Sequence, residues 1–119
     1  MVQKNTFEKN VFSFQTIFNN LANLIDMSTA RQVPVLSIGI PDSAYQAESP
    51  RARSKRDGVN RMLEEKALNE PDLLHYIPCP IPFEENSKYF DPDGLHFSKE
   101  GYKQFGKLLA EQAFKILEL

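Results

Sequence analysis

The stretch Val33-Pro-Val-Leu-Ser-Ile-Gly-Ile40 is short, mostly apolar and rich in β-branched side chains. Such residues favour a strand, and a strand without polar alternation is typical of a parallel sheet that helices cover on both faces. Pro34 fits near the first residue of this strand, where a missing N–H group matters least, and Pro41 ends the strand. The stretch therefore predicts an α/β fold built around a buried strand.

Upstream of this strand, the sequence predicts a long amphipathic helix over residues 7–25 that ends near Ala30 or Arg31. Asn5 and Glu8 are three residues apart, which fits a capping box at the start of the helix. Apolar side chains recur at intervals of three and four residues and form one continuous stripe: Phe7, Val11, Phe14, Phe18, Leu21 and Ile25.

Downstream, we expect a loop over residues 41–52, a helix over residues 53–69 and a second strand over residues 72–77. A long proline-rich loop follows, and Ser98 is the expected N-cap of a final helix. The order is therefore α-β-α-β-α, and this alternation predicts a parallel strand pair flanked by helices. The final helix carries an apolar face of Tyr102, Phe105, Leu109, Ala113 and Ile116.

Two parallel strands do not make a stable sheet by themselves, because at least one strand keeps an unpaired hydrogen-bonding edge. We therefore expect residues 1–119 to form a single partial domain. Either strands are missing and a further stretch of polypeptide completes the sheet, or the chain associates with itself.

Composition excludes several classes of protein. Fourteen Lys and Arg stand against sixteen Asp and Glu, so the chain lacks the basic excess of a nucleic-acid binder. No apolar run approaches the roughly 18 residues that cross a bilayer. The N-terminus has no apolar signal region, which leaves the location of the protein open and favours the cytoplasm only slightly. A single cysteine, Cys79, excludes an intramolecular disulfide and a zinc site built on several thiolates.

The densest group of chemically active residues is Phe90-Asp-Pro-Asp-Gly-Leu-His-Phe-Ser98, which precedes the final helix. Asp93 lies three residues before His96, so its carboxylate can reach Nδ1–H of the imidazole and leave Nε2 free as a base. An ordinary Asp-Gly turn beside a surface histidine explains the same spacing. A metal site of Asp91, Asp93 and His96 is a weaker alternative, and we predict no metal and no cofactor.

This segment, followed by Gly101-Tyr102 and Gly106, resembles the last conserved block of the SGNH hydrolases, also called GDSL esterases and lipases. The resemblance implies the C-terminal part of a three-layer α/β/α flavodoxin-like fold. It also implies that His96 is the general base of a Ser-His-Asp triad and that Asp93 is its carboxylate partner. The family's Gly-Asp-Ser nucleophile turn and Gly-x-Asn-Asp oxyanion turn have no counterpart in this sequence. Ser43 lacks the glycine and the spacing of such a nucleophile, and we interpret it as a loop hydroxyl.

Other residues are weaker candidates. Phe83 and Phe90 either line an acyl pocket or pack the long loop onto the core, and Arg56 is a candidate for contact with an ester substrate. Arg53, Arg56, Asn60 and Arg61 together are expected to form a solvated helix face. His75 is expected to be structural and Cys79 unreactive.

Two functions follow from the sequence. The first is the C-terminal part of a serine ester hydrolase for small or lipid-like esters, inactive without its missing blocks because base and nucleophile work as a unit. The second is a non-catalytic α/β binding module derived from an esterase fold.

Overall fold

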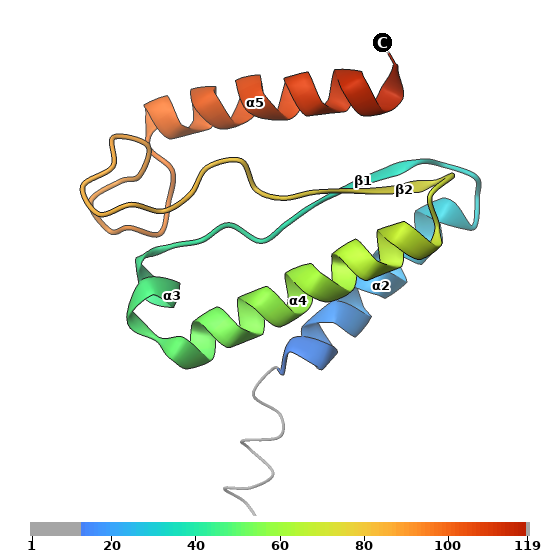
Figure 1. The fold of residues 1–119 in the computed structure, drawn as a ribbon, viewed down its shortest axis with the longest axis horizontal. Coiled ribbons are helices and arrows are strands. Elements are labelled where there is room, and N and C mark those ends of the chain that lie inside the picture. Colours follow the sequence, from blue (N-terminus) through green and yellow to red (C-terminus); the bar gives the residue numbers. More distant parts are fainter. Residues whose placement is uncertain (1–12, 119) are drawn as a thin grey trace, which may run out of the picture.

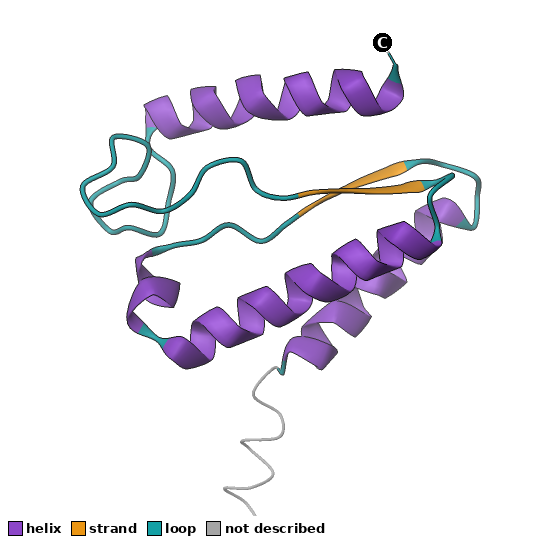
Figure 2. Cartoon of the chain, viewed as in Figure 1, coloured by secondary structure: helices purple, strands orange, loops and turns teal. Residues whose placement is uncertain are grey.

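The computed structural model describes residues 13–118, which form a small α/β domain with a parallel two-stranded sheet (Figure 2). The predicted alternation of helices and strands is confirmed, with one additional short helix. In chain order the elements are α2 (Phe14–Thr29), β1 (Val35–Ile38), α3 (Ala44–Glu48), α4 (Pro50–Asn69), β2 (Leu74–Ile77) and α5 (Lys99–Leu117).

The sheet separates the helices into two groups. Helices α2 and α4 lie together on one side of it, and α5 lies on the other side (Figure 1). Strands β1 and β2 run parallel, with Val35 opposite Leu74 and Ile38 opposite Ile77. The connection between the strands runs through α3 and α4, as a parallel pair requires.

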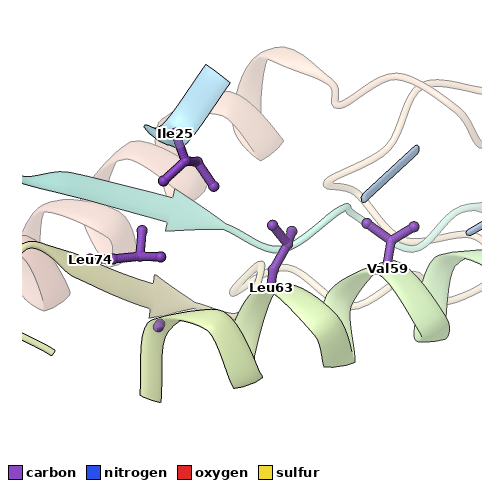
Figure 3. Packing of buried hydrophobic residues seen from close by; sticks show 5 residues of the cluster. Ile25, Val59, Leu63 and Leu74 are labelled. Carbon is purple, nitrogen blue, oxygen red and sulfur yellow. The ribbon is translucent and has the colours of Figure 1, made fainter. Parts of the chain in front are cut away.

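The core lies between α2, α4 and the sheet. Val59 and Leu63 point from α4 toward the strands, where they meet Leu74 of β2 and Ile25 of α2 (Figure 3). Val59 and Leu74 are the largest side chains that are completely buried. Burial of an aliphatic side chain of this size contributes about 1.5–3 kcal/mol, so this cluster fixes α4 on the sheet.

Helix α2 starts later than the periodicity predicts. Ser13 has an extended backbone, and its hydroxyl accepts a hydrogen bond from the N–H of Thr16, so Ser13 is the N-cap. A single helix across residues 7–25 is therefore wrong, although the predicted end at Ala30 is confirmed. Asn5 and Glu8 lie outside the described residues.

The predicted loop over residues 41–52 is also partly wrong. It contains α3, and α4 begins at Pro50 rather than at Arg53. Two serine caps explain the difference: the hydroxyl of Ser43 accepts from the N–H of Tyr45, and that of Ser49 accepts from the N–H of Ala52.

The prediction that both strands are buried on both faces is wrong for β1 and holds only in part for β2, in which His75 and Tyr76 are half-buried. All four residues of β1 are half-buried, whereas Leu74 and Ile77 of β2 are buried. On the far side of the sheet, α5 buries only Gly101 completely, and Tyr102 and Phe114 are 60% and 55% exposed. Since the sheet has two strands, β1 keeps the expected free edge within the described residues.

None of the helices in the described part of the chain combines the length and the apolar character needed to cross a membrane.

Candidate acid–base site

Asp93 and His96 lie in the loop that connects β2 to α5. The Oδ2 atom of Asp93 lies 2.6 Å from Nδ1 of His96. Its other oxygen, Oδ1, accepts the backbone N–H groups of Leu95 at 2.8 Å and His96 at 3.1 Å. Each carboxylate oxygen therefore has its own donors, which fixes the orientation of both side chains. The contact that the three-residue spacing predicts is confirmed.

These contacts shift the proton affinity of both groups. The hydrogen bond from His96 and the two backbone N–H donors lower the pKa of Asp93 to about 2. The hydrogen bond and charge of Asp93, with a smaller contribution from Asp91, raise the pKa of His96 above its ordinary value of 6.5. Asp93 is therefore charged at neutral pH, and the neutral imidazole is held with its proton on Nδ1. Both side chains remain accessible, with 69% of His96 and 45% of Asp93 exposed.

A tight turn shapes the loop around this pair. The N–H of Asp91 donates to the carbonyl of His96 at 2.8 Å, and Gly94 turns the chain with a φ of 69°. A side chain on Gly94 would be strained at that φ, and its Cβ would lie 2.5 Å from Cβ of Ala44. The N–H of Ala44 donates to the carbonyl of Gly94 at 2.9 Å, so the start of α3 holds the turn in place.

The first turn of α5 closes the base of the loop. The hydroxyl of Ser98 caps the helix by accepting from the N–H of Gly101 at 3.0 Å, and it donates to the carbonyl of Lys88 at 2.6 Å. The N–H of Ser98 donates to the carbonyl of Tyr89 at 2.9 Å. Gly101 is required here because a Cβ atom would overlap with the carbonyl oxygen of Tyr89. The Ser98 cap predicted from sequence is confirmed, and it also anchors the loop.

A series of aromatic rings in contact packs the loop against the start of α5. Phe90 packs edge-to-face against Phe83 and Phe97, with ring centroids 5.1 and 5.2 Å apart, and Phe97 continues the contact to Tyr102 and Phe105 at 5.5 Å. Phe90 is only 7% exposed. These contacts fit packing of the loop. Phe83 and Phe90 also border a separate cavity of about 810 Å³ together with Asp93 and Gly94, so both roles that the sequence offered stay open.

His96 lines a groove of about 450 Å³ between the end of β1 and the start of α5. Neither Phe83 nor Phe90 borders it. The sequence did not single out the residues that do, although Tyr102 and Phe105 lie on the predicted apolar face of α5. The groove is lined by Ile38, Gly39, Ile40, Pro41, Leu95, Phe97, Tyr102 and Phe105.

The expectation of a solvated face is wrong for Arg56 and Asn60. The Asn60 side chain accepts from the N–H of Ile40 at 2.8 Å and donates to the carbonyl of Ile40 at 3.2 Å. Nε of Arg56 donates to the same carbonyl at 3.0 Å. Both side chains therefore bond to backbone groups of Ile40 that a neighbouring strand would otherwise bond. Arg56 does not border the groove of His96. Arg53 and Arg61 are exposed, as predicted.

The remaining candidates stay apart from the Asp93–His96 pair. The hydroxyl of Ser43 is bonded to Gln46 and caps α3. Burial raises the pKa of the Cys79 thiol, which is the opposite of an activated cysteine. In residues 13–118, no hydroxyl hydrogen-bonds to His96, and no group of three carboxylate, imidazole or thiol side chains is placed to hold a metal ion.

No protein-family model matches the chain, and no curated protein or solved structure shows significant similarity to it.

Proposed function

We propose that this chain supplies the acid–base half of a serine ester hydrolase, with His96 as the general base and Asp93 as its orienting carboxylate. The observation that carries the proposal is the 2.6 Å contact between Nδ1 of His96 and Oδ2 of Asp93, on an imidazole that borders an apolar groove. Since Nδ1 holds the proton that Asp93 accepts, Nε2 of the neutral ring carries the lone pair that a base needs.

In this reaction Nε2 of His96 takes the proton of a serine hydroxyl as the serine oxygen bonds to the ester carbonyl carbon. The imidazolium then returns that proton to the departing alcohol, which leaves an acyl-enzyme. A water molecule repeats the sequence, with its proton passing to His96 and then to the serine, and releases the carboxylic acid. Throughout, Asp93 stabilises the positive charge of the imidazolium.

The proposal requires a serine nucleophile and oxyanion donors from polypeptide that carries the Gly-Asp-Ser and Gly-x-Asn-Asp blocks. We propose that this polypeptide completes a three-layer α/β/α flavodoxin-like sheet next to β1. Two observations support it. The first is the free edge of β1: the backbone N–H and C=O groups of Leu36 and Ile38 point away from β2 and face this edge. The second observation is the apolar face of α5, where Tyr102 is 60% exposed and Phe105, Leu109, Ala113 and Ile116 are only half-buried.

The groove beside His96 supports an acyl ester as the substrate class. Its lining is mainly aliphatic and aromatic, which suits the acyl chain of a small or lipid-like ester. Leu95, Phe97 and Tyr102 replace Phe83, Phe90 and Arg56 as the residues proposed to contact this chain, because the first three border the groove and the others do not.

The proposal is tested by reading the genomic sequence directly upstream of Met1 and in the adjacent genes. We expect in-frame Gly-Asp-Ser and Gly-x-Asn-Asp blocks. The protein that includes them should hydrolyse p-nitrophenyl acetate, and a fluorophosphonate should label its serine. His96→Ala should abolish hydrolysis, and Asp93→Ala should reduce it strongly. Absence of both blocks, or full activity in His96→Ala, would overturn the proposal.

The second candidate is a non-catalytic binding module, and it is favoured by the absence of a hydroxyl bonded to His96 within residues 13–118. Both candidates predict that the chain alone cleaves p-nitrophenyl acetate no faster than its His96→Ala variant. Rapid cleavage that Ser43→Ala abolishes would contradict our placement of the nucleophile. If upstream sequence encodes neither block and the chain behaves as a stable monodisperse protein, the binding module is the better description.

A further inference from the structure

A second cavity, of about 390 Å³, lies between α2, α3, α4 and the segment that follows β1. It is separate from the groove of His96, and Ile40 is the single residue that borders both. Its volume lies within the range of about 300–1,000 Å³ that is usual for small-molecule sites. The elements around it, α3 and the first turns of α4, adjoin each other in Figure 1.

The inner wall of this cavity is apolar and continuous with the core. It is formed by Ile17, Ile40, Ala52 and Val59. Val59 is fully buried, and Ile17 and Ile40 pack against the same core cluster. These side chains are fixed by the packing of α2 and α4, so the wall is preformed and suits a short alkyl chain.

The lining of this cavity also contains three cationic side chains. Arg51, Lys55 and Arg56 border the cavity and come from the first two turns of α4. Cations at the N-terminal end of a helix are disfavoured by the helix dipole, and the first turn of α4 has no acidic residue to offset them. Within residues 13–118, Arg56 pairs with Asp57, whereas Arg51 and Lys55 form no ion pair.

We propose that this cavity binds an amphiphilic anion, a short-chain to medium-chain alkyl carboxylate, with its alkyl chain on Ile17 and Ile40 and its carboxylate between Arg51 and Lys55. Both halves of the site are needed. The apolar wall alone gives no preference for charge, and the cations alone give no preference for an alkyl tail. The proposal does not depend on hydrolysis at His96, because the two sites share only Ile40.

The test uses the full chain, with octanoate as the probe and isothermal titration calorimetry as the assay at low ionic strength. Octanamide has the same tail with an uncharged head, and acetate has the same head without the tail. We expect octanoate to bind with saturation, and octanamide and acetate each to bind at least about tenfold more weakly. Amide resonances of Ile17, Ile40 and Val59 should shift as octanoate is added, while those of Leu95 and Phe97 should not.

The double variant Arg51→Gln/Lys55→Gln should weaken octanoate binding about tenfold with little change in stability, because Arg51 is exposed, Lys55 is only half-buried, and neither forms an ion pair within residues 13–118. Lys103→Gln/Lys107→Gln removes the same charge from α5, away from the cavity, and should change affinity less than about twofold. Four results would each overturn the proposal. Octanamide could bind as tightly as octanoate, or octanoate could fail to saturate in the millimolar range. The resonance shifts could be confined to the His96 groove, or the two double variants could have equal effects.

Discussion

Gly101 and Gly106 lie on the same helix, and the structure predicts opposite effects when each is replaced by alanine. In α5, Gly101 is in the first turn, where a Cβ atom would overlap with the carbonyl oxygen of Tyr89 and lie 2.9 Å from its carbonyl carbon. It would also lie 3.0 Å from Cβ of Phe97. Outside the nearby backbone of its own helix, Gly106 has no atom within 4 Å of the corresponding position.

The size of each effect follows from these contacts. Replacing glycine by alanine in a helix gains about 1 kcal/mol, and Gly106→Ala should be more stable than the wild type by up to this amount. In Gly101→Ala the overlapping atom belongs to the backbone and cannot rotate away, so α5 must move off the loop. Overpacking costs about 1–3 kcal/mol. Loss of the Ser98 hydrogen bonds to Lys88 and Tyr89 adds about 1 kcal/mol each. After the helix gain is subtracted, we expect a net loss of about 2–4 kcal/mol.

Urea unfolding followed by circular dichroism measures both variants against the wild type at one pH and temperature. The resonances of Asp93 and His96 provide a second measurement, because the same contacts hold their loop. In Gly101→Ala these resonances should shift or broaden, whereas in Gly106→Ala they should stay in place. If Gly101→Ala is as stable as Gly106→Ala, the close approach of α5 to Tyr89 is wrong, and so is the proposed support of the acid–base pair.

The remaining predictions concern the pair itself and Ile40. Asp93→Asn removes the main cause of the raised pKa of His96, so its NMR titration midpoint should fall toward 6.5; an unchanged midpoint would contradict the contact. Because folding lowers the pKa of Asp93 from 3.8 to about 2, its charge stabilises the fold above pH 3.8, and this contribution is lost as the pH falls through about 2. The difference between the urea midpoints of wild type and Asp93→Asn should therefore shrink as the pH falls from 3.8 to about 2. A constant difference over this pH range would contradict the contribution of the Asp93 charge to stability. Asn60→Ala leaves the N–H of Ile40 without its acceptor and should cost about 1–3 kcal/mol, against less than about 0.5 kcal/mol for the exposed Arg61→Ala, both measured by urea unfolding.

Local patterns predicted much of what the structure contains. The end of α2, the Ser98 cap and the contact between Asp93 and His96 each depend on residues within a few positions of one another. The predicted start of α2 is wrong because the apolar spacing extends to residues before Ser13, whereas the Ser13 cap starts the helix at Phe14. Helix α3 was missed because its five residues are too few for a periodic pattern.

The sequence by itself determined the alternation of helices and strands and the local geometry of the Asp93–His96 turn, because short-range spacing encodes both. The alternation in turn implied the parallel pair, since a helical connection between two strands suits a parallel arrangement. The tertiary structure decided which surfaces meet. Asn60 binds Ile40 across 20 positions, and His96 shares its groove with Ile38 of β1 rather than with Phe83. Such contacts depend on how α4 and α5 sit against the sheet, and side-chain periodicity does not encode that placement. The packing of α4 against the sheet also brings Arg51 and Lys55 to the cavity that Val59 lines, and this is the cavity proposed for an alkyl carboxylate.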